Sequence, residues 1–202
     1  MNDPYLLHRF GEQSPSYEHD LSHYGSDTLQ CVDNWDGLQR RNLFTIPHVT
    51  KLTTYTYGGF CAGWKFTYND TREFDHYIFD DTNGVPSGYT ETVYTLDTTG
   101  SQEHINGMYA YADTATTSEL PVSAYEFRTS SGNAYSCGSK AAGAARRVIL
   151  SPNANRSLLS TNVCIYNPVG TTQPHVVTTQ AWYINNELWG YPGADFSYQG
   201  DG

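Results

Sequence analysis

The stretch KLTTYTYGGFCAGWKFTYND, residues 51–70, indicates the fold most clearly. It begins with Lys51–Tyr57, which is rich in threonine and tyrosine, and it contains a second segment of the same kind, Trp64–Tyr68. β-Branched and aromatic side chains favour extended backbone. Gly58 and Gly59 lie between the two segments, and glycine supplies the positive-φ positions that a hairpin turn needs. The stretch therefore predicts two strands joined by a tight turn.

The same pattern continues along most of the chain. Six further segments rich in Val, Ile, Thr, Tyr and Phe are predicted as strands, namely Tyr89–Leu96, Met108–Tyr111, Val122–Thr129, Arg147–Leu150, Val163–Tyr166 and Val176–Ile184. Turn residues separate them at Asn83–Gly84, Thr99–Gly100 and Ser131–Asn133. Only Lys140–Ala145 could form a turn or two of helix. The pattern predicts an all-β protein.

An internal similarity suggests how the strands are organised. Gly63–Asp70 resembles Gly107–Asp113, and Ser123–Thr129 is a weaker third copy. Similar β units repeated in one chain suggest sheets arranged around a pseudo-threefold axis, with their inner faces meeting in a shared core. Chance similarity among short strands is the alternative.

The composition limits the partners. The chain has 21 Asp and Glu against 11 Lys and Arg, a formal net charge of −10. Proteins that grip nucleic acid or anionic lipid need a surplus of cations, and no apolar run approaches the roughly 18 residues of a membrane span. We therefore expect neither nucleic-acid binding nor membrane insertion. Charged residues make up 16% of the chain and it has 17 tyrosines, so we expect Tyr and Thr on polar, mostly neutral outer faces.

The cysteines bear on the compartment. The chain contains four of them, Cys31, Cys61, Cys137 and Cys164. They form no Cys-x-x-Cys pair, so zinc-ligand spacing is absent. Two disulfides with three possible connectivities fit an oxidising compartment, and four buried thiols in a cytosolic protein are the alternative. Asn69 and Asn155 begin glycosylation sequons, and the residues after Met1 lack the features of a signal peptide. We expect the mature form of an extracellular or cell-surface glycoprotein.

Several short motifs resemble those of the jacalin-type lectins. Trp35–Gly37 resembles the family's early Trp-Asp-(Asp)-Gly, and Gly63–Tyr68 is similar to its I-x-G-I-x-F-x-Y strand. Glu103–Tyr109 resembles the E-x-I-x-x-V-x-G region, and Val122–Cys137 resembles the L-x-F-x-T-N-x-x-x-Y-G strand pair. The likeness covers roughly residues 33–185.

This resemblance implies a fold, a β-prism of three Greek-key antiparallel sheets with irregular terminal arms. On that basis residues 1–30 are an N-terminal arm, residues 31–187 form the β-prism-like domain, and residues 188–202 are a C-terminal aromatic tail. In such a prism the first strand and the late strands share a sheet.

The same resemblance suggests a cysteine pairing. A shared sheet would place Cys31 near Cys164, which leaves Cys61 for Cys137. Closing loops this long stabilises a protein by roughly 4 kcal/mol each in the chain-entropy model.

The resemblance also implies a sugar site at one end of the prism. Family members build it from a glycine-rich loop, a variable loop and a Gly-x-x-x-Asp loop whose Asp accepts hydrogen bonds from sugar hydroxyls. The corresponding carbohydrate-binding candidates are Tyr24, Gly25, Asp113, Thr116, Glu119, Gly170, Thr172 and Gln173. The Gly-Gly signature is missing, and Gly170–Pro174 has no acid where the family has its Asp. We therefore expect the standard site to be altered or lost.

No motif predicts catalysis. Glycosidases need two carboxylates at a fixed separation, and nothing in the crowded acids between Asp70 and Asp81 fixes such a pair. Asp80–Gly84 superficially resembles a calcium loop but lacks the spacing and terminal Glu of an EF-hand, so a solvated acidic loop is the preferred interpretation. Gly-x-Ser-x-Gly and His-Glu-x-x-His motifs are absent. We expect neither an enzyme nor a metal or cofactor site.

Recognition by aromatic and polar side chains remains. Aromatic rings pack on the C–H faces of sugars, while neutral polar groups answer the hydroxyls. Trp64 and Trp182 are expected in the core, whereas Trp189 and Tyr191 are candidates for surface contact. The leading hypothesis is a non-catalytic, secreted or surface lectin whose partners are glycans or glycoproteins. The alternative is an assembly protein whose terminal arms clasp neighbouring subunits in an extracellular filament, coat or matrix.

Overall fold

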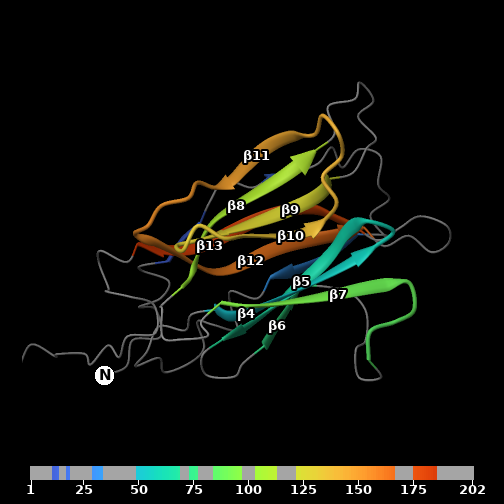
Figure 1. The fold of residues 1–202 in the computed structure, drawn as a ribbon, viewed down its shortest axis with the longest axis horizontal. Helices are drawn as coiled ribbons and strands as arrows, with labels where there is room; N and C mark the ends of the chain where they lie inside the picture. Colours follow the sequence, from blue (N-terminus) through green and yellow to red (C-terminus); the bar gives the residue numbers. More distant parts are fainter. Residues whose placement is uncertain are drawn as a thin grey trace, which may run out of the picture.

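Figure 1 shows the computed structural model of the chain, which describes its strands and the connections between several of them. The described residues are 11–13, 17–18, 29–33, 49–68, 73–76, 84–96, 103–112, 122–166 and 175–185. Within these ranges every regular element is a β-strand, and the strands form three antiparallel sheets. The all-β prediction is confirmed.

Sheet I and sheet II have the same topology. Sheet I contains β4 (Val49–Tyr57), β5 (Phe60–Tyr68), β6 (Glu73–His76) and β7 (Tyr89–Thr95), in the order β6-β5-β4-β7. Sheet II contains β8 (Ile105–Ala112), β9 (Val122–Thr129), β10 (Ala134–Gly138) and β11 (Ala145–Leu150), in the order β10-β9-β8-β11. In each, three consecutive strands lie side by side and the fourth returns beside the first, which is a Greek key.

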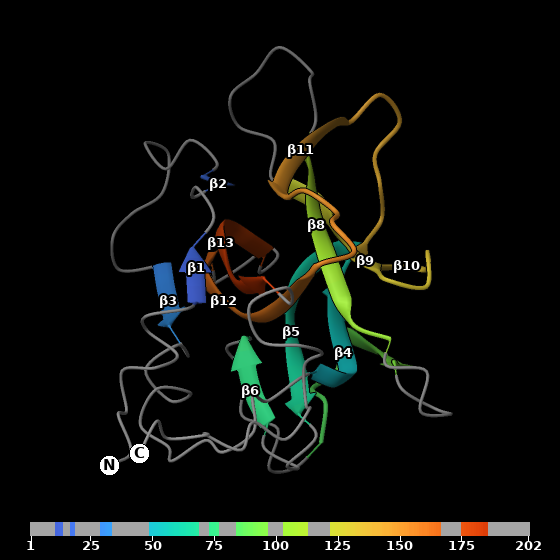
Figure 2. The same ribbon diagram turned by 90° about the vertical axis from the view of Figure 1, so that its left-hand side faces the viewer.

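Sheet III joins the two ends of the chain. It contains β1 (Gly11–Gln13), β2 (Tyr17–Glu18), β3 (Leu29–Asp33), β12 (Arg156–Tyr166) and β13 (His175–Asn185). The order is β1-β13-β12-β3, and β2 also pairs with β13. Read from β12 through β13 to β1 and then to β3, the sheet repeats the Greek-key order of the other two. The predicted prism of three Greek-key sheets is therefore confirmed, and Figure 2 shows the sheets facing one another around a common interior.

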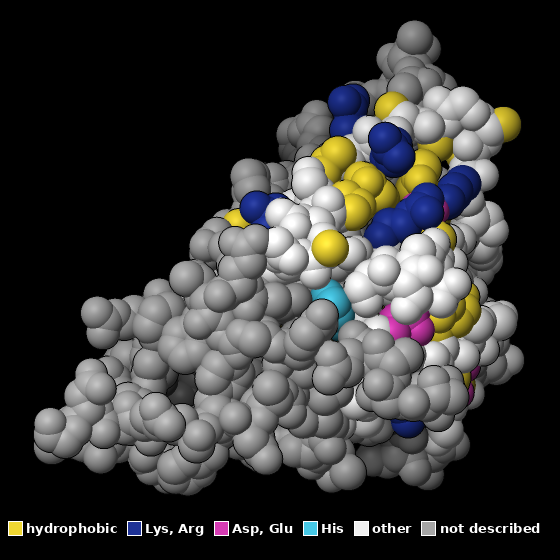
Figure 3. Space-filling model, turned by 60° about the vertical axis from the view of Figure 1, so that its left-hand side comes forward, with side chains coloured by type: hydrophobic (Ala, Val, Ile, Leu, Met, Phe, Trp, Pro, Cys, Tyr) yellow, Lys and Arg dark blue, Asp and Glu magenta, His cyan; other side chains and the backbone are white. Residues whose placement is uncertain are grey.

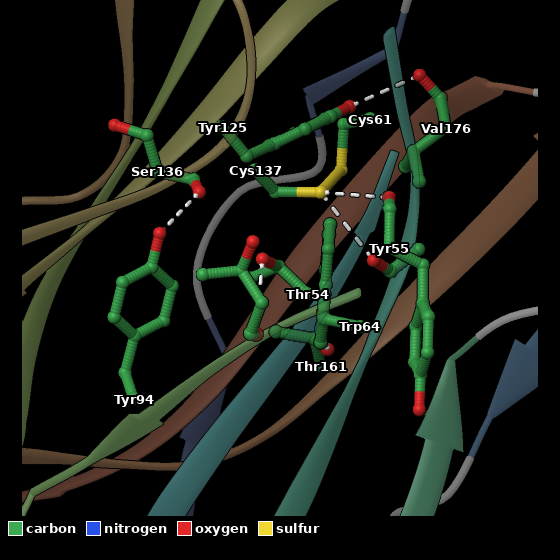
Figure 4. Close-up of a disulfide and its surroundings, with 12 residues drawn as sticks. Thr54, Tyr55, Cys61, Trp64, Tyr94, Tyr125, Ser136, Cys137, Thr161 and Val176 are labelled. Atoms are coloured by element: carbon green, nitrogen blue, oxygen red, sulfur yellow. Dashed lines mark hydrogen bonds between the residues drawn. A yellow bond between two sulfur atoms is a disulfide. The ribbon is translucent and has the colours of Figure 1, made fainter. Parts of the chain in front are cut away.

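Trp64 of β5 lies where the three sheets meet. Its side chain is fully buried, and its ring lies 5.2 Å from the rings of Tyr125 and Phe127 on β9. Its indole N–H donates a hydrogen bond to the Thr161 hydroxyl of β12, 3.0 Å away. Figure 4 shows Trp64 between Tyr125 and Thr161. One side chain thus contacts all three sheets, in agreement with the predicted core position.

Tyrosine hydroxyls link each sheet to the next. Tyr68 of sheet I donates to the Leu159 carbonyl of sheet III. Tyr125 of sheet II donates to the Val176 carbonyl of sheet III at 3.4 Å, and Tyr94 of sheet I donates to the Ser136 carbonyl of sheet II at 3.2 Å (Figure 4). The expectation that tyrosines belong to outer faces is therefore wrong for Tyr68 and Tyr125, which are fully buried. Their rings fill the core, and their hydroxyls use carbonyls of a facing sheet.

The disulfide between Cys61 and Cys137 confirms one predicted pairing. It joins β5 of sheet I to β10 of sheet II, and both residues are fully buried (Figure 4). In sheet III the register places Cys31 of β3 opposite Cys164 of β12, and Cys164 is disulfide-bonded. This register agrees with the second predicted pairing.

Two local expectations were wrong. Lys140–Ala145 contains no helix; it forms a turn, closed by the Ala144 N–H to the Ala141 carbonyl, and then enters β11. The N-terminal arm is not irregular throughout, because β1 and β2 pair with β13. These two strands are too short to show an alternating pattern of side chains. Pairing with the edge of β13, rather than the β-propensity of their own residues, makes them extended.

The internal similarity relates different positions of the two Greek keys. Gly63 lies in β5, the second strand of its key, whereas Gly107 lies in β8, the first strand of the next. The counterpart of β5 by strand order is β9, which contains Ser123–Thr129, the weaker third copy of the sequence pattern. Equivalence in the fold therefore follows strand order rather than local sequence.

Candidate functional site

One end of the prism, here called the loop end, gathers strand ends from sheets II and III. In sheet III, Leu29 at the start of β3 pairs with Tyr166 at the end of β12, and Tyr166 pairs with His175 at the start of β13. In sheet II, Ala112 at the end of β8 pairs with Val122 at the start of β9. The hydrogen bond from Tyr125 to Val176 joins β9 to β13 close to these ends. The arrowheads of β8 and β10 point to this end, at the right of Figure 1.

Sheet I reaches the same end through the β4–β5 turn. The Ser139 N–H, just after β10, donates to the Gly59 carbonyl at 2.8 Å. Next to this turn, Tyr57 and Tyr89 are paired in register, and their rings meet edge to face at 5.0 Å. Burial, and then repulsion from Tyr57, raises the pKa of Tyr89, so its phenol stays protonated and able to donate at neutral pH. The two half-buried rings add an aromatic surface to this end of the prism.

The predicted sugar-site residues lie outside the described residues. The set is Tyr24, Gly25, Asp113, Thr116, Glu119, Gly170, Thr172 and Gln173. They belong to the segment before β3, the β8–β9 connection and the β12–β13 connection. The strand ends that flank these three segments all lie at the loop end. Each predicted loop therefore leaves from and returns to that end of the prism.

A charged cluster occupies the outer face of sheet II. Glu126 of β9 has a side chain only 1% exposed, and it accepts from Arg128 at 2.5 Å and from Lys140. The Tyr111 hydroxyl donates to the same carboxylate at 3.3 Å. Burial alone raises the pKa of Glu126, but the hydrogen bonds and charges of Lys140 and Arg128 outweigh it and hold that pKa below its usual value.

This cluster was not predicted from the sequence, although a count of charged residues within residues 122–166 indicates it. Residues 122–166 contain Arg128, Lys140, Arg146, Arg147 and Arg156 against the single acid Glu126, a net charge of +4. The rest of this −10 chain therefore carries −14. An average over the whole chain hides the basic segment.

Replacing the buried carboxylate tests its role in stability. We expect Glu126→Gln to lower the free energy of unfolding by about 2 kcal/mol at pH 7, because hydrogen bonds to charged groups are lost. A lowered folded-state pKa gives stability that is present above the unfolded pKa, near 4.5, and lost as pH falls through the folded value. The gap between the two proteins in urea unfolding should therefore shrink below that pH.

Glu91→Gln is the matched control for this prediction. Glu91 lies on the edge strand β7, is exposed, and accepts one hydrogen bond from Tyr55 at 3.4 Å. We expect a change of less than about 1 kcal/mol. A gap for Glu126→Gln that is equally small, or that does not change with pH, would contradict the assignment.

Comparison with known proteins identifies the fold. No family model matches the chain, and no curated protein sequence matches it. A mannose-specific jacalin-related lectin from Morus nigra, solved in complex with mannose, superposes with a TM-score of 0.53 at 11% identity, over 87% of this chain and 95% of the lectin. The mannose-binding jacalin-related lectin from Ananas comosus gives 0.51 at 12% identity, over 87% and 98%.

The fold is that of the jacalin-related lectins. A lamprey immune protein shares it, with a TM-score of 0.54 at 12% identity. That match covers 87% of this chain, but this chain spans only 44% of the lamprey protein. At these identities the likeness establishes the architecture, and the jacalin-type resemblance of the sequence motifs is supported at the level of fold.

Among the described residues, no group of three His, Cys, Asp or Glu side chains is placed to hold a metal ion. In the same part of the chain no helix is long and apolar enough to cross a membrane. Of the two sequons, Asn69 lies outside the described residues, whereas Asn155 is exposed in the turn before β12.

Proposed function

We propose that the protein binds carbohydrate at the loop end and catalyses no reaction. The observation that carries the proposal is that strand ends flanking the three predicted loops gather at one end of a prism whose fold mannose-binding lectins share. Gly170–Pro174 contains no acid, so the acceptors for sugar hydroxyls come from Asp113 and Glu119 of the β8–β9 connection. The half-buried rings of Tyr57 and Tyr89 add an apolar surface nearby.

The proposed location is extracellular or at the cell surface. The buried disulfide between Cys61 and Cys137 fits an oxidising compartment, and exposed Asn155 fits a secreted glycoprotein. The assembly alternative, in which both terminal arms clasp neighbouring subunits, is weakened for the N-terminal arm. β1 and β2 of the N-terminal arm pair with β13 of their own chain, so these residues are engaged within the subunit rather than extended toward a neighbour.

A glycan array followed by titration with a bound glycan tests the proposal. We expect at least one neutral glycan to bind, and we expect Asp113→Asn/Glu119→Gln to weaken that glycan about a hundredfold, because a charged hydrogen bond contributes about 1.5–3 kcal/mol. Thr172→Ala/Gln173→Ala should weaken it about tenfold.

Glu91→Gln, which removes an exposed carboxylate of β7, is the control and should leave the affinity unchanged. An array without a binder, or equal affinities for all these variants, would exclude the loop end as a sugar site. Self-association that is lost on deletion of residues 188–202, together with an empty array, would favour the assembly alternative.

A further inference from the structure

Three cations of residues 122–166 are gathered on one surface. Arg128 lies on β9, Arg146 lies on β11, and Lys140 lies in the connection between β10 and β11. Arg147 follows Arg146 in β11, so its side chain points to the opposite face, and the register pairs it with the buried Ala110. We call the outer surface of sheet II formed by Arg128, Lys140 and Arg146 the basic face. Figure 3 shows Lys and Arg side chains alternating with hydrophobic ones over this part of the molecule.

Tyrosine rings hold two of these cations in place. The Arg146 guanidinium lies 4.7 Å from the centre of the Tyr109 ring, and the Lys140 ammonium lies 4.4 Å from that of Tyr111. Cation–π contacts of this kind stabilise a charge without neutralising it. The register pairs Arg146 with Tyr111 across β11 and β8, so both rings lie beside the basic face.

The only acid of the segment lies underneath the cations. Glu126 is 1% exposed, whereas Arg128 is 37% exposed and Lys140 is 41% exposed. The carboxylate therefore anchors two cations from below while their outer sides remain in solvent. Arg146 is also exposed. The surface presented to solvent is positive although the whole chain is negative.

We propose that the basic face binds an acidic polysaccharide, a chain of sugars that carry carboxylate or sulfate groups. Cations already ordered by rings and by a buried acid lose little conformational freedom on binding. Guanidinium groups match the oxygens of carboxylates and sulfates in paired hydrogen bonds. A nucleic-acid duplex fits less well, because it carries one charge per about 1.7 Å and the rest of this chain repels so dense an array.

The basic face adjoins the loop end, because Lys140 and Arg146 both lie beside Tyr111 near the end of β8. The two surfaces differ in what they recognise. The ligand of the basic face is recognised by charge, whereas the loop end is proposed to recognise neutral hydroxyls, so an acidic and a neutral probe test the two proposals separately.

Binding of dextran sulfate and polygalacturonate, with neutral dextran as reference, tests the basic face. We expect the wild-type protein to bind at least one of the two acidic polymers, and the stronger of them names the preferred group. Arg146→Gln should weaken that binding about tenfold and lower the slope of affinity against salt by about one. Arg146 is exposed on an edge strand, so the variant should keep the wild-type melting temperature.

Arg147→Gln, which removes an exposed cation from the opposite face of the same strand, is the matched control and should bind like the wild type. Equal losses in the two variants would overturn the proposal, as would no binding to either acidic polymer at low salt. Double-stranded DNA that binds as tightly, and that is weakened as much by Arg146→Gln, would make the face a general polyanion site and would also overturn the proposal. So would self-association that Arg146→Gln abolishes in a protein that binds no polysaccharide.

Discussion

Gly138→Ala is expected to lower the free energy of unfolding by about 4 kcal/mol or more, among the largest effects of any single methyl group in this chain. Gly138 has φ +89°, a conformation that side chains rarely adopt. A Cβ there would lie 2.2 Å from the Ser123 carbonyl oxygen and 2.9 Å from the Cys61 backbone nitrogen. Both neighbours are backbone atoms, so no rotamer change relieves the contact. Urea unfolding followed by tryptophan fluorescence measures the loss.

Gly132→Ala separates backbone strain from the clash. Gly132 has φ +84°, but no heavy atom lies within 4 Å of its would-be Cβ. We expect this variant to lose only about 1–2 kcal/mol, the cost of a left-handed non-glycine residue. If the two alanine variants lost the same stability, the close approach of sheets I and II at Gly138 would be wrong.

Removing the buried disulfide should have an effect of similar size. Cys61 and Cys137 are 76 residues apart. Closing a loop of that length stabilises the folded state by roughly 4 kcal/mol in the chain-entropy model. We expect Cys61→Ala/Cys137→Ala to lose about that much, and the wild-type protein to lose more when reduced, because reduction also opens the bond of Cys164. The loss should appear as a shift of the urea midpoint, because the fold itself is kept.

The companion variant Cys31→Ala/Cys164→Ala tests the second pairing. The stabilisation depends only on the logarithm of loop length, so a Cys31–Cys164 bond should contribute a similar amount. A peptide map under non-reducing conditions should recover Cys61 with Cys137 and Cys31 with Cys164. Any other connectivity would contradict the pairing, and four free thiols would contradict both the pairing and the extracellular location.

The long strands could be predicted from the sequence because each combines β-branched and aromatic residues with a clear turn. Lys51–Tyr57 and Val122–Thr129 are examples, and both form strands with nearly these bounds. Glu73–His76 and Ala134–Gly138 escaped prediction, because strands of four or five polar-rich residues carry too little pattern. Their partners β5 and β9 fix them.

The candidate sites differ in how far the sequence could locate them. The loop end followed from a family resemblance, and the strand ends now support its location. The basic face did not follow, because Arg128 and Arg146 are separated by a whole strand and a turn. They share a surface only because β9, β8 and β11 lie side by side in sheet II. Charge that is dispersed in sequence becomes a patch through strand order.

The composition of sheet III has a consequence for biosynthesis. Sheets I and II are each built from one continuous stretch, so each has all its strands once residue 95 or residue 150 has left the ribosome. Sheet III is different, because β1, β2 and β3 pair only with β12 and β13 in the described part of the chain. β1, β2 and β3 therefore cannot pair until β12 and β13 have been synthesised. Pairings so distant in sequence form slowly, and unpaired strand edges are prone to pair with other chains. Closure of the prism is therefore a late step, and a nascent chain is most exposed to aggregation just before it.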